Sequence, residues 1–202
     1  LAIFVSATET FAKQNLGTTL DGAIDMAAPV VRAAKREGIQ VRGYISMCFG
    51  DPWEGRVDPA APAAVAARLL ELGCSTISLG DTIGVATAGH VLAVLDRVRA
   101  AGVPRDRIAL HLHDTYGQAL ANVLAGLEAG ITEFDSSAGG LGGCPYAKSA
   151  TGNLATEDLV WMLDGLGIET GIDLMKLAAT SRWLAATLGR PSPSRVVAAL
   201  GI

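Results

Sequence analysis

The sequence predicts an α/β fold of the (β/α)8 TIM-barrel class, and three observations lead to it. Short apolar runs alternate with amphipathic helical segments five times along the chain, as in a parallel sheet built from βα units. Polar residues follow the strand ends, where a barrel carries its active site. Each unit takes roughly 32 residues, and eight would need about 250. We therefore expect residues 1–202 to be a single domain comprising the last five βα units plus C-terminal helices, with the first three units missing.

The elements follow in order along the chain. Strands are expected at residues 1–5, 41–45, 75–79, 107–113 and 131–135. Helices are expected at residues 20–34, 59–72, 87–98, 116–129 and 173–188, with one more beginning at Thr156. Thr18 or Thr19 should begin the first helix. No glycine fingerprint follows the first strand, so dinucleotide binding has little support, but a doubly wound open sheet remains the alternative architecture.

Local signals refine several of these boundaries. Pro29 lies inside the first helical pattern and predicts a kink or a break. Asp58 caps the second helix, with Pro59 at its first position, after a loop over residues 46–58. Thr156 should cap its helix, whose first turn is acidic. The last stretch, with two prolines, should be peripheral.

Composition narrows the class of protein. Half of the residues are hydrophobic, 18% are charged and the net charge is -4, which fits a globular protein and excludes wholesale nucleic-acid binding. No apolar run approaches the roughly 20 residues of a membrane span. Three cysteines without regular spacing favour a reducing compartment over a disulfide framework, and Cys48 and Cys74 are most simply buried or idle thiols. Together with the alanine, glycine and arginine content, this predicts a cytoplasmic bacterial protein.

A pair of histidines marks one strand end. His111 and His113 are two residues apart, so both point to the same face of the strand and can ligate one cation. The alternative is a pair of satisfied core histidines. The third histidine, His90, lies at a predicted helix start and should be solvated.

A cysteine follows a run of glycines. Four of the five residues before Cys144 are glycine, which leaves the thiol little shielded and well placed for chemistry. The alternative is a plain turn with an incidental cysteine. Asp81 ends another strand, where an aspartate is most often an Asx-turn residue.

Three segments carry a resemblance to a known family. They are DSSAGGLGGCPYA at residues 135–147, continued by GNLATEDLV at 152–160, SLGDTIG at 78–84, and HLHDTYGQ at 111–118. In their order along the chain, these segments resemble hydroxymethylglutaryl-CoA lyase, and the resemblance covers nearly the whole chain. The resemblance implies cleavage of 3-hydroxy-3-methylglutaryl-CoA to acetoacetate and acetyl-CoA, a lyase reaction of leucine degradation and ketone body metabolism.

The resemblance also implies a metal site. The family binds a divalent cation, Mg²⁺ or Mn²⁺, through an aspartate, two histidines and an asparagine. His111, His113 and Asn153 match three of these ligands. The fourth, together with a catalytic arginine and glutamate, belongs to family strands that precede the matched part, so none of them is assigned to a position here.

Further roles follow from the same resemblance. Cys144 would protonate the enolate product, His111 would help to shuttle protons, and Asp81 would orient the site. Asn15 and Ser78 match positions that bind the acyl-CoA substrate. We also expect a homodimer. Two alternatives stay open: another acyl-CoA or 2-oxo-acid lyase or synthase of the same metal-dependent barrel superfamily, and a non-catalytic fragment.

Overall fold

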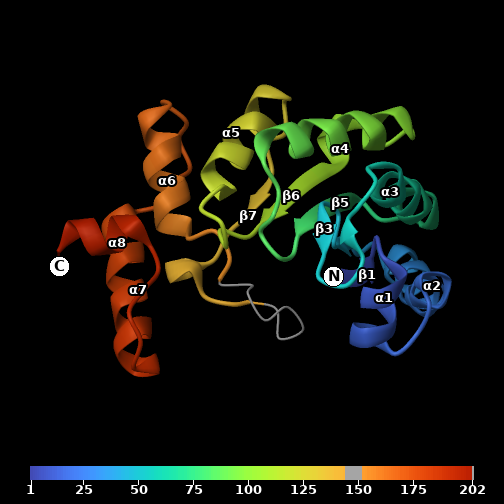
Figure 1. Cartoon of the computed structure of the whole chain (residues 1–202), viewed down its shortest axis with the longest axis horizontal. Coiled ribbons are helices and arrows are strands. Elements are labelled where there is room, and N and C mark those ends of the chain that lie inside the picture. The colour runs from blue at the N-terminus through green and yellow to red at the C-terminus, as the bar shows by residue number, and fades with distance from the viewer. Residues whose placement is uncertain (144–151, 202) are drawn as a thin grey trace.

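The computed structural model describes residues 1–143 and 152–201, and within them five parallel strands form the main sheet (Figure 1). These strands are β1 (Ala2–Ser6), β2 (Arg42–Ser46), β5 (Thr76–Asp81), β6 (Ile108–Leu112) and β7 (Phe134–Asp135). They lie in the sheet in the same order as in the chain. A doubly wound sheet reverses its strand order at a switch point, so that alternative is wrong for the described strands.

The sheet is strongly curved. Arg42 on β2 pairs with Asp135 on β7 at 2.7 Å, although β5 and β6 lie between these strands. In a flat sheet three strand spacings would separate the two backbones by about 14 Å, which is beyond the combined reach of these side chains. The inner faces of β2 and β7 therefore turn toward each other, as in part of a barrel wall.

Helices connect the strands and continue after the last one. Between strands lie α1 (Glu9–Phe11), the π-helical turn η1 (Ala12–Leu16), α2 (Leu20–Arg36), α3 (Ala60–Leu72), α4 (Ala88–Ala100), the 3-10 turn η2 (Arg105–Arg107) and α5 (Ala119–Glu128). After β7 come the 3-10 turn η3 (Ala138–Gly140), α6 (Thr156–Gly165), α7 (Leu174–Leu188) and α8 (Arg195–Leu200). In Figure 1, α6 lies next to α5, and α7 and α8 lie beyond α6 at the same end of the molecule. None of the described helices has both the length and the apolar character needed to cross a bilayer.

Strand alternation separates a core face from a polar face. Ile45, Ile77 and Leu110 are fully buried and belong to the main hydrophobic core, with residues from the flanking helices. Residues of the opposite parity, such as Tyr44 and His111, lie on the inner face of the curved sheet. The core therefore forms between sheet and helices, and the polar side chains are left for the inner face.

Most predicted boundaries are confirmed. The Thr19 hydroxyl caps α2 by accepting a bond from the Gly22 amide, and the Asp173 carboxylate caps α7. Gly73 ends α3 in the left-handed conformation, with φ of 117°. Cys48 and Cys74 are buried free thiols, and burial raises the pKa of Cys74 to about 11.

Several boundaries are corrected. Of the kink or break predicted at Pro29, the break is wrong, because α2 runs through this exposed position. The predicted loop over residues 46–58 holds a hairpin of β3 (Gly50–Asp51) and β4 (Gly55–Arg56). The fourth helix begins at Ala119 because Gly117 adopts a left-handed φ in a preceding turn. The last strand is shorter than predicted, since β7 pairs only with β6 at its end.

The corrections continue at the C-terminal side. Thr156 does not cap α6: Ala155 is the N-cap residue, and the Thr156 hydroxyl bonds that of Ser136. The final stretch lies at the edge of the molecule in Figure 1, but it is ordered: it forms α8, whose N-cap Ser194 is buried. His90 is half-buried, with a buried Nδ1 that has no partner, so the predicted solvated side chain is wrong.

Candidate metal and active site

The two histidines lie together at the C-terminal end of β6. The ring centroids of His111 and His113 are 5.3 Å apart. His113 is buried and its Nδ1 has no hydrogen-bond partner. Burial, with the neighbouring His111, lowers the pKa of His113 to about 4, so this ring is neutral at pH 7. A neutral imidazole is the form that binds a metal.

Asn153 lies beside this pair. Its backbone forms an antiparallel bridge with His113. Its Nδ2 donates to the Leu141 carbonyl at 2.9 Å, while its Oδ1 is buried without a partner. The His113 ring nitrogen and the Asn153 amide oxygen are buried without a hydrogen-bond partner. As ligands of a divalent cation, both atoms would gain a partner. Residues 1–143 and 152–201 contain no group of three His, Cys, Asp or Glu side chains that could hold a metal, so among them the amide oxygen of Asn153 is the group that joins the histidine pair.

Asp135 organises the inner face. It accepts from the Ser78 hydroxyl at 3.0 Å, lies 3.2 Å from His111 Nδ1 and pairs with Arg42 at 2.7 Å. Burial alone would raise the pKa of Asp135, but the His111 hydrogen bond and the Arg42 charge outweigh it and hold the pKa below its ordinary value. Asp135 is therefore an anion that fixes one ring nitrogen of His111.

Arg42 is committed to partners within the chain. Besides Asp135, it pairs with Glu133, and its guanidinium lies 5.1 Å from the Tyr44 ring centroid. Tyr44 in turn stacks on Phe4 and meets His111 edge-on. Burial, and secondarily the Asp135 charge, raises the pKa of Tyr44, which keeps its hydroxyl neutral. These residues form a wall beneath the histidines.

Asp81 has a structural role that the geometry defines. Its carboxylate accepts from the amides of Val85 and Ala86, both at 3.0 Å, in the loop after β5. Burial raises its pKa to about 6, against the opposing effect of the loop amides. The carboxyl group thus shapes the loop and can change protonation near neutrality.

The predicted site residues are brought together only in part. His111, His113 and Asn153 gather at one sheet end, and Ser78 joins them through Asp135. Asn15 is exposed on η1 and forms none of these contacts. Cys144 lies outside the described residues.

Three residues of the inner face were not predicted from the sequence as part of the site: Arg42, Tyr44 and Asp135. The available signal was parity, because Arg42 and Tyr44 alternate with buried positions along β2. An arginine inside a strand with that parity indicates a polar inner face.

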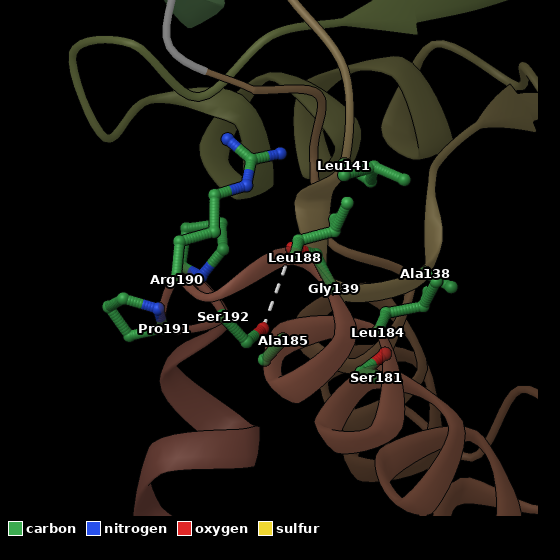
Figure 2. Close-up of a pocket in the computed structure, with 11 residues that line it drawn as sticks. Ala138, Gly139, Leu141, Ser181, Leu184, Ala185, Leu188, Arg190, Pro191 and Ser192 are labelled. Carbon is green, nitrogen blue, oxygen red and sulfur yellow. Dashed lines mark hydrogen bonds between the residues drawn. The ribbon is translucent and has the colours of Figure 1, made fainter.

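The glycine run before Cys144 is anchored from below. The amide of Gly139 donates to both carboxylate oxygens of Glu157, at 3.0 and 3.1 Å, and the Ser181 hydroxyl donates to the same carboxylate. Figure 2 shows Gly139 close to Ser181 on α7 and to Ser192. These residues line a small cavity of about 20 Å³. Glu157 on α6 is fully buried, and these hydrogen bonds hold the start of the glycine run against α6 and α7.

A larger cavity has Asp114, the residue after His113, among its lining residues. It has a volume of about 600 Å³ and lies between the loop after β6 and helices α5, α6 and α8. Its walls are mainly apolar, with Leu120, Trp161 and Met162 among them, and Arg195 lies at its border.

Comparison with known proteins identifies the family. A family model described as HMGL-like matches residues 1–184. The chain belongs to the HMGL-like family. It is 50% identical, over 97% of its length, to the cytoplasmic 3-hydroxy-3-methylglutaryl-CoA lyase of Danio rerio.

Solved HMGL-like structures agree in fold. The hydroxymethylglutaryl-CoA lyase of Pseudomonas aeruginosa matches with a TM-score of 0.94 and 48% identity, over 98% of this chain and 66% of that one. A lyase of Acinetobacter baumannii in complex with coenzyme A and 3-methylmalate matches with a TM-score of 0.92 and 36% identity, over 98% of this chain and 65% of that one. The chain spans 58% of the Danio rerio protein, which is less than two thirds of its length.

Proposed function

We propose that the intact protein is a carbon–carbon lyase that cleaves 3-hydroxy-3-methylglutaryl-CoA to acetoacetate and acetyl-CoA. The supporting observation is the 50% identity to a lyase of that name over nearly the whole chain. The histidine pair and Asn153, adjacent at one sheet end, supply chemistry suited to such a reaction.

The site residues fit a divalent cation. His111, His113 and Asn153 would hold Mg²⁺ or Mn²⁺, since the buried Asn153 Oδ1 and His113 Nδ1 lack other partners. When bound, such a cation lowers the pKa of the substrate's C3 hydroxyl and fixes its orientation.

The remaining steps are proton transfers. A base removes the C3 hydroxyl proton, the C2–C3 bond breaks as the C3 carbonyl forms, and its electrons remain on C2 as the acetyl-CoA enolate. Cys144 donates a proton to that carbon, because a thiol with a pKa near 8.5 can give up a proton close to neutrality. His111 would help to relay protons through its Nδ1, which faces the Asp135 carboxylate, while its other ring nitrogen would hold the cation. Asp81 keeps the loop after β5 in place.

The same proposal includes the architecture. The five strands would be the last five of a (β/α)8 barrel, preceded in the intact polypeptide by three more units. The curvature of the sheet and the two-thirds coverage of a homologous chain support this. A homodimer and a cytoplasmic location remain part of the proposal, the latter supported by cysteine usage.

A second substrate is suggested by one relative. A Pseudomonas aeruginosa protein, 48% identical over 99% of this chain, is named 3-hydroxy-3-isohexenylglutaryl-CoA/hydroxy-methylglutaryl-CoA lyase. Assays of the intact protein with Mg²⁺ or Mn²⁺ on both acyl-CoA substrates decide between them. We expect acetoacetate from 3-hydroxy-3-methylglutaryl-CoA. Cleavage of the longer substrate alone would reassign the specificity, and cleavage of neither would refute the function.

A further inference from the structure

The side chain of Asn153 faces two ways. Its Nδ2 donates to the Leu141 carbonyl at 2.9 Å, and its Oδ1 is buried without a partner. A carbonyl oxygen only accepts, so the amino end of the amide must face Leu141. Oδ1 is then the free end, on a residue whose backbone pairs with His113.

The glycine run is packed closely against Asn153. A Cβ at Gly142, where φ is 113°, would lie 2.5 Å from Asn153 Nδ2. A Cβ at Gly140 would lie 3.0 Å from the Asn153 carbonyl, and one at Gly152 would lie 2.2 Å from the Gly140 carbonyl. Glycines at these positions therefore allow the backbone of the loop to reach the amide of Asn153.

Among the described residues, two side chains bond to the backbone at the outer end of this run. Leu141, Gly142 and Gly143 are exposed. The Leu141 carbonyl accepts from the Ser137 hydroxyl as well as from Asn153. These two side chains therefore fix the backbone that leads into Cys144, while Glu157 fixes its base.

The residue type poses a chemical question. Hard divalent cations prefer carboxylates, so an aspartate at position 153 would be the stronger ligand. An aspartate, however, would place an acceptor against the Leu141 carbonyl, which is also an acceptor. The amide of asparagine offers both, an acceptor at one end and a donor at the other.

We propose that Asn153 is a positioning residue as well as a ligand: Nδ2 holds residues 139–143 in place while Oδ1 serves the cation. Cation binding and loop placement are thereby linked through one side chain. The ligand half of the proposal, that Oδ1 binds the cation, rests on the proposed function. The loop half, that Nδ2 holds residues 139–143, rests on the contacts alone.

The test compares Asn153→Asp with the parent in the intact protein. Mn²⁺ affinity is measured by electron paramagnetic resonance, and backbone amide exchange of residues 139–143 by mass spectrometry. In the parent, saturating Mn²⁺ should slow this exchange. In Asn153→Asp, Mn²⁺ should bind at least as tightly, metal-free exchange should be about two- to tenfold faster, as expected for one lost hydrogen bond, and Mn²⁺ should no longer slow it.

A matched variant separates the two halves. Ser137→Ala removes the other donor to the Leu141 carbonyl but keeps Asn153. It should speed metal-free exchange, and Mn²⁺ should still slow that exchange because the Asn153 amide is intact. Loss of the slowing in Ser137→Ala would overturn the link, so the proposal stays testable if Asn153→Asp misfolds. Parent-like exchange in Asn153→Asp, or slowing by Mn²⁺ equal to that in the parent, would overturn the proposal. Failure of the parent to bind Mn²⁺ would refute the proposed function and the ligand half, while the metal-free comparison would still decide the loop half.

Discussion

At the scale of single residues, Asp135 connects the inner face of the sheet to the histidine pair. It lies 3.2 Å from His111 Nδ1, and it is itself held by Ser78 and Arg42. A carboxylate on one ring nitrogen fixes the tautomer of an imidazole and aims the other nitrogen at the site. Asp135 therefore determines how His111 can act.

Replacing Asp135 by Asn should weaken Mn²⁺ binding by about 10- to 100-fold, the usual effect of losing such a partner. The matched control is Glu133→Gln, because Glu133 also pairs with Arg42 but does not bond to His111. Titration calorimetry with Mn²⁺ checks both variants. Equal weakening in the two would mean that Arg42, and not His111, transmits the effect.

Asp81 should make stability depend on pH. Its folded pKa of about 6 is above the ordinary value of 3.8, so the folded state binds this proton more tightly than the unfolded state. The contribution of protonated Asp81 to the free energy of unfolding is fully present below about pH 4 and is lost as pH rises to about 6. The free energy of unfolding should change by about 3 kcal/mol over this range.

Asp81→Asn should remove this dependence, because an amide does not ionise. Relative to the parent, the variant should therefore gain stability as pH rises from 4 to 7. Urea unfolding of both proteins at several pH values measures the difference in unfolding free energy. A difference that stays constant with pH would show that the carboxyl group has an ordinary pKa.

The sequence was sufficient to predict which face of a strand each side chain takes, because side chains alternate between the two faces. The His-x-His spacing fixes a common strand face, and the structure confirms that His111 and His113 lie together. The Arg42–Asp135 pair joins residues 93 positions apart across two intervening strands. Periodicity reports which face a side chain takes but not how far the sheet curves, so this contact could not be predicted.

At the scale of elements, α6 joins three segments of the fold through its first turn. Glu157 binds the base of the glycine run and Ser181 on α7. Asp158 accepts from the Ser194 hydroxyl at 2.6 Å and from the first amides of α8. The sequence predicted that Glu157 and Asp158 would lie in the first turn of a helix, where they suit its dipole, and the structure confirms this position. Their partners depend on how the later helices fold back, which a local rule does not contain.

Glu157→Gln should destabilise the protein by about 1–3 kcal/mol, since an amino group would then face the Gly139 amide or the Ser181 hydroxyl. Urea denaturation measures this loss. Glu169→Gln is the control, because Glu169 is exposed and should change the stability little. A loss in Glu157→Gln no larger than in the control would show that the buried carboxylate does not hold the loop and helices together.

At the scale of the whole molecule, β1 and β7 are the edges of the described sheet. Leu1 and Phe4 on the β1 side are apolar and more than half exposed. Open strand edges and exposed apolar residues favour association with further chain. This agrees with the proposal that more strands complete the barrel, and the repeat length of the βα units already pointed to it.

Residues 1–202 expressed alone should therefore cleave no 3-hydroxy-3-methylglutaryl-CoA. Acetoacetate release with added Mg²⁺ or Mn²⁺ measures this, with the intact polypeptide as the positive control. Turnover by the 202 residues at ordinary enzyme rates, about 1–10³ per second, would show that no further strands are needed and that the proposed barrel is wrong.

The most direct test of the central claim is His113→Ala in the intact protein, with bound metal and acetoacetate release measured on the same sample. Both should fall together, activity by at least about 10²-fold. His90→Ala, which changes the histidine on α4, should leave both unchanged. Full metal content and full activity in His113→Ala would contradict the metal site, and with it the mechanism proposed for this protein.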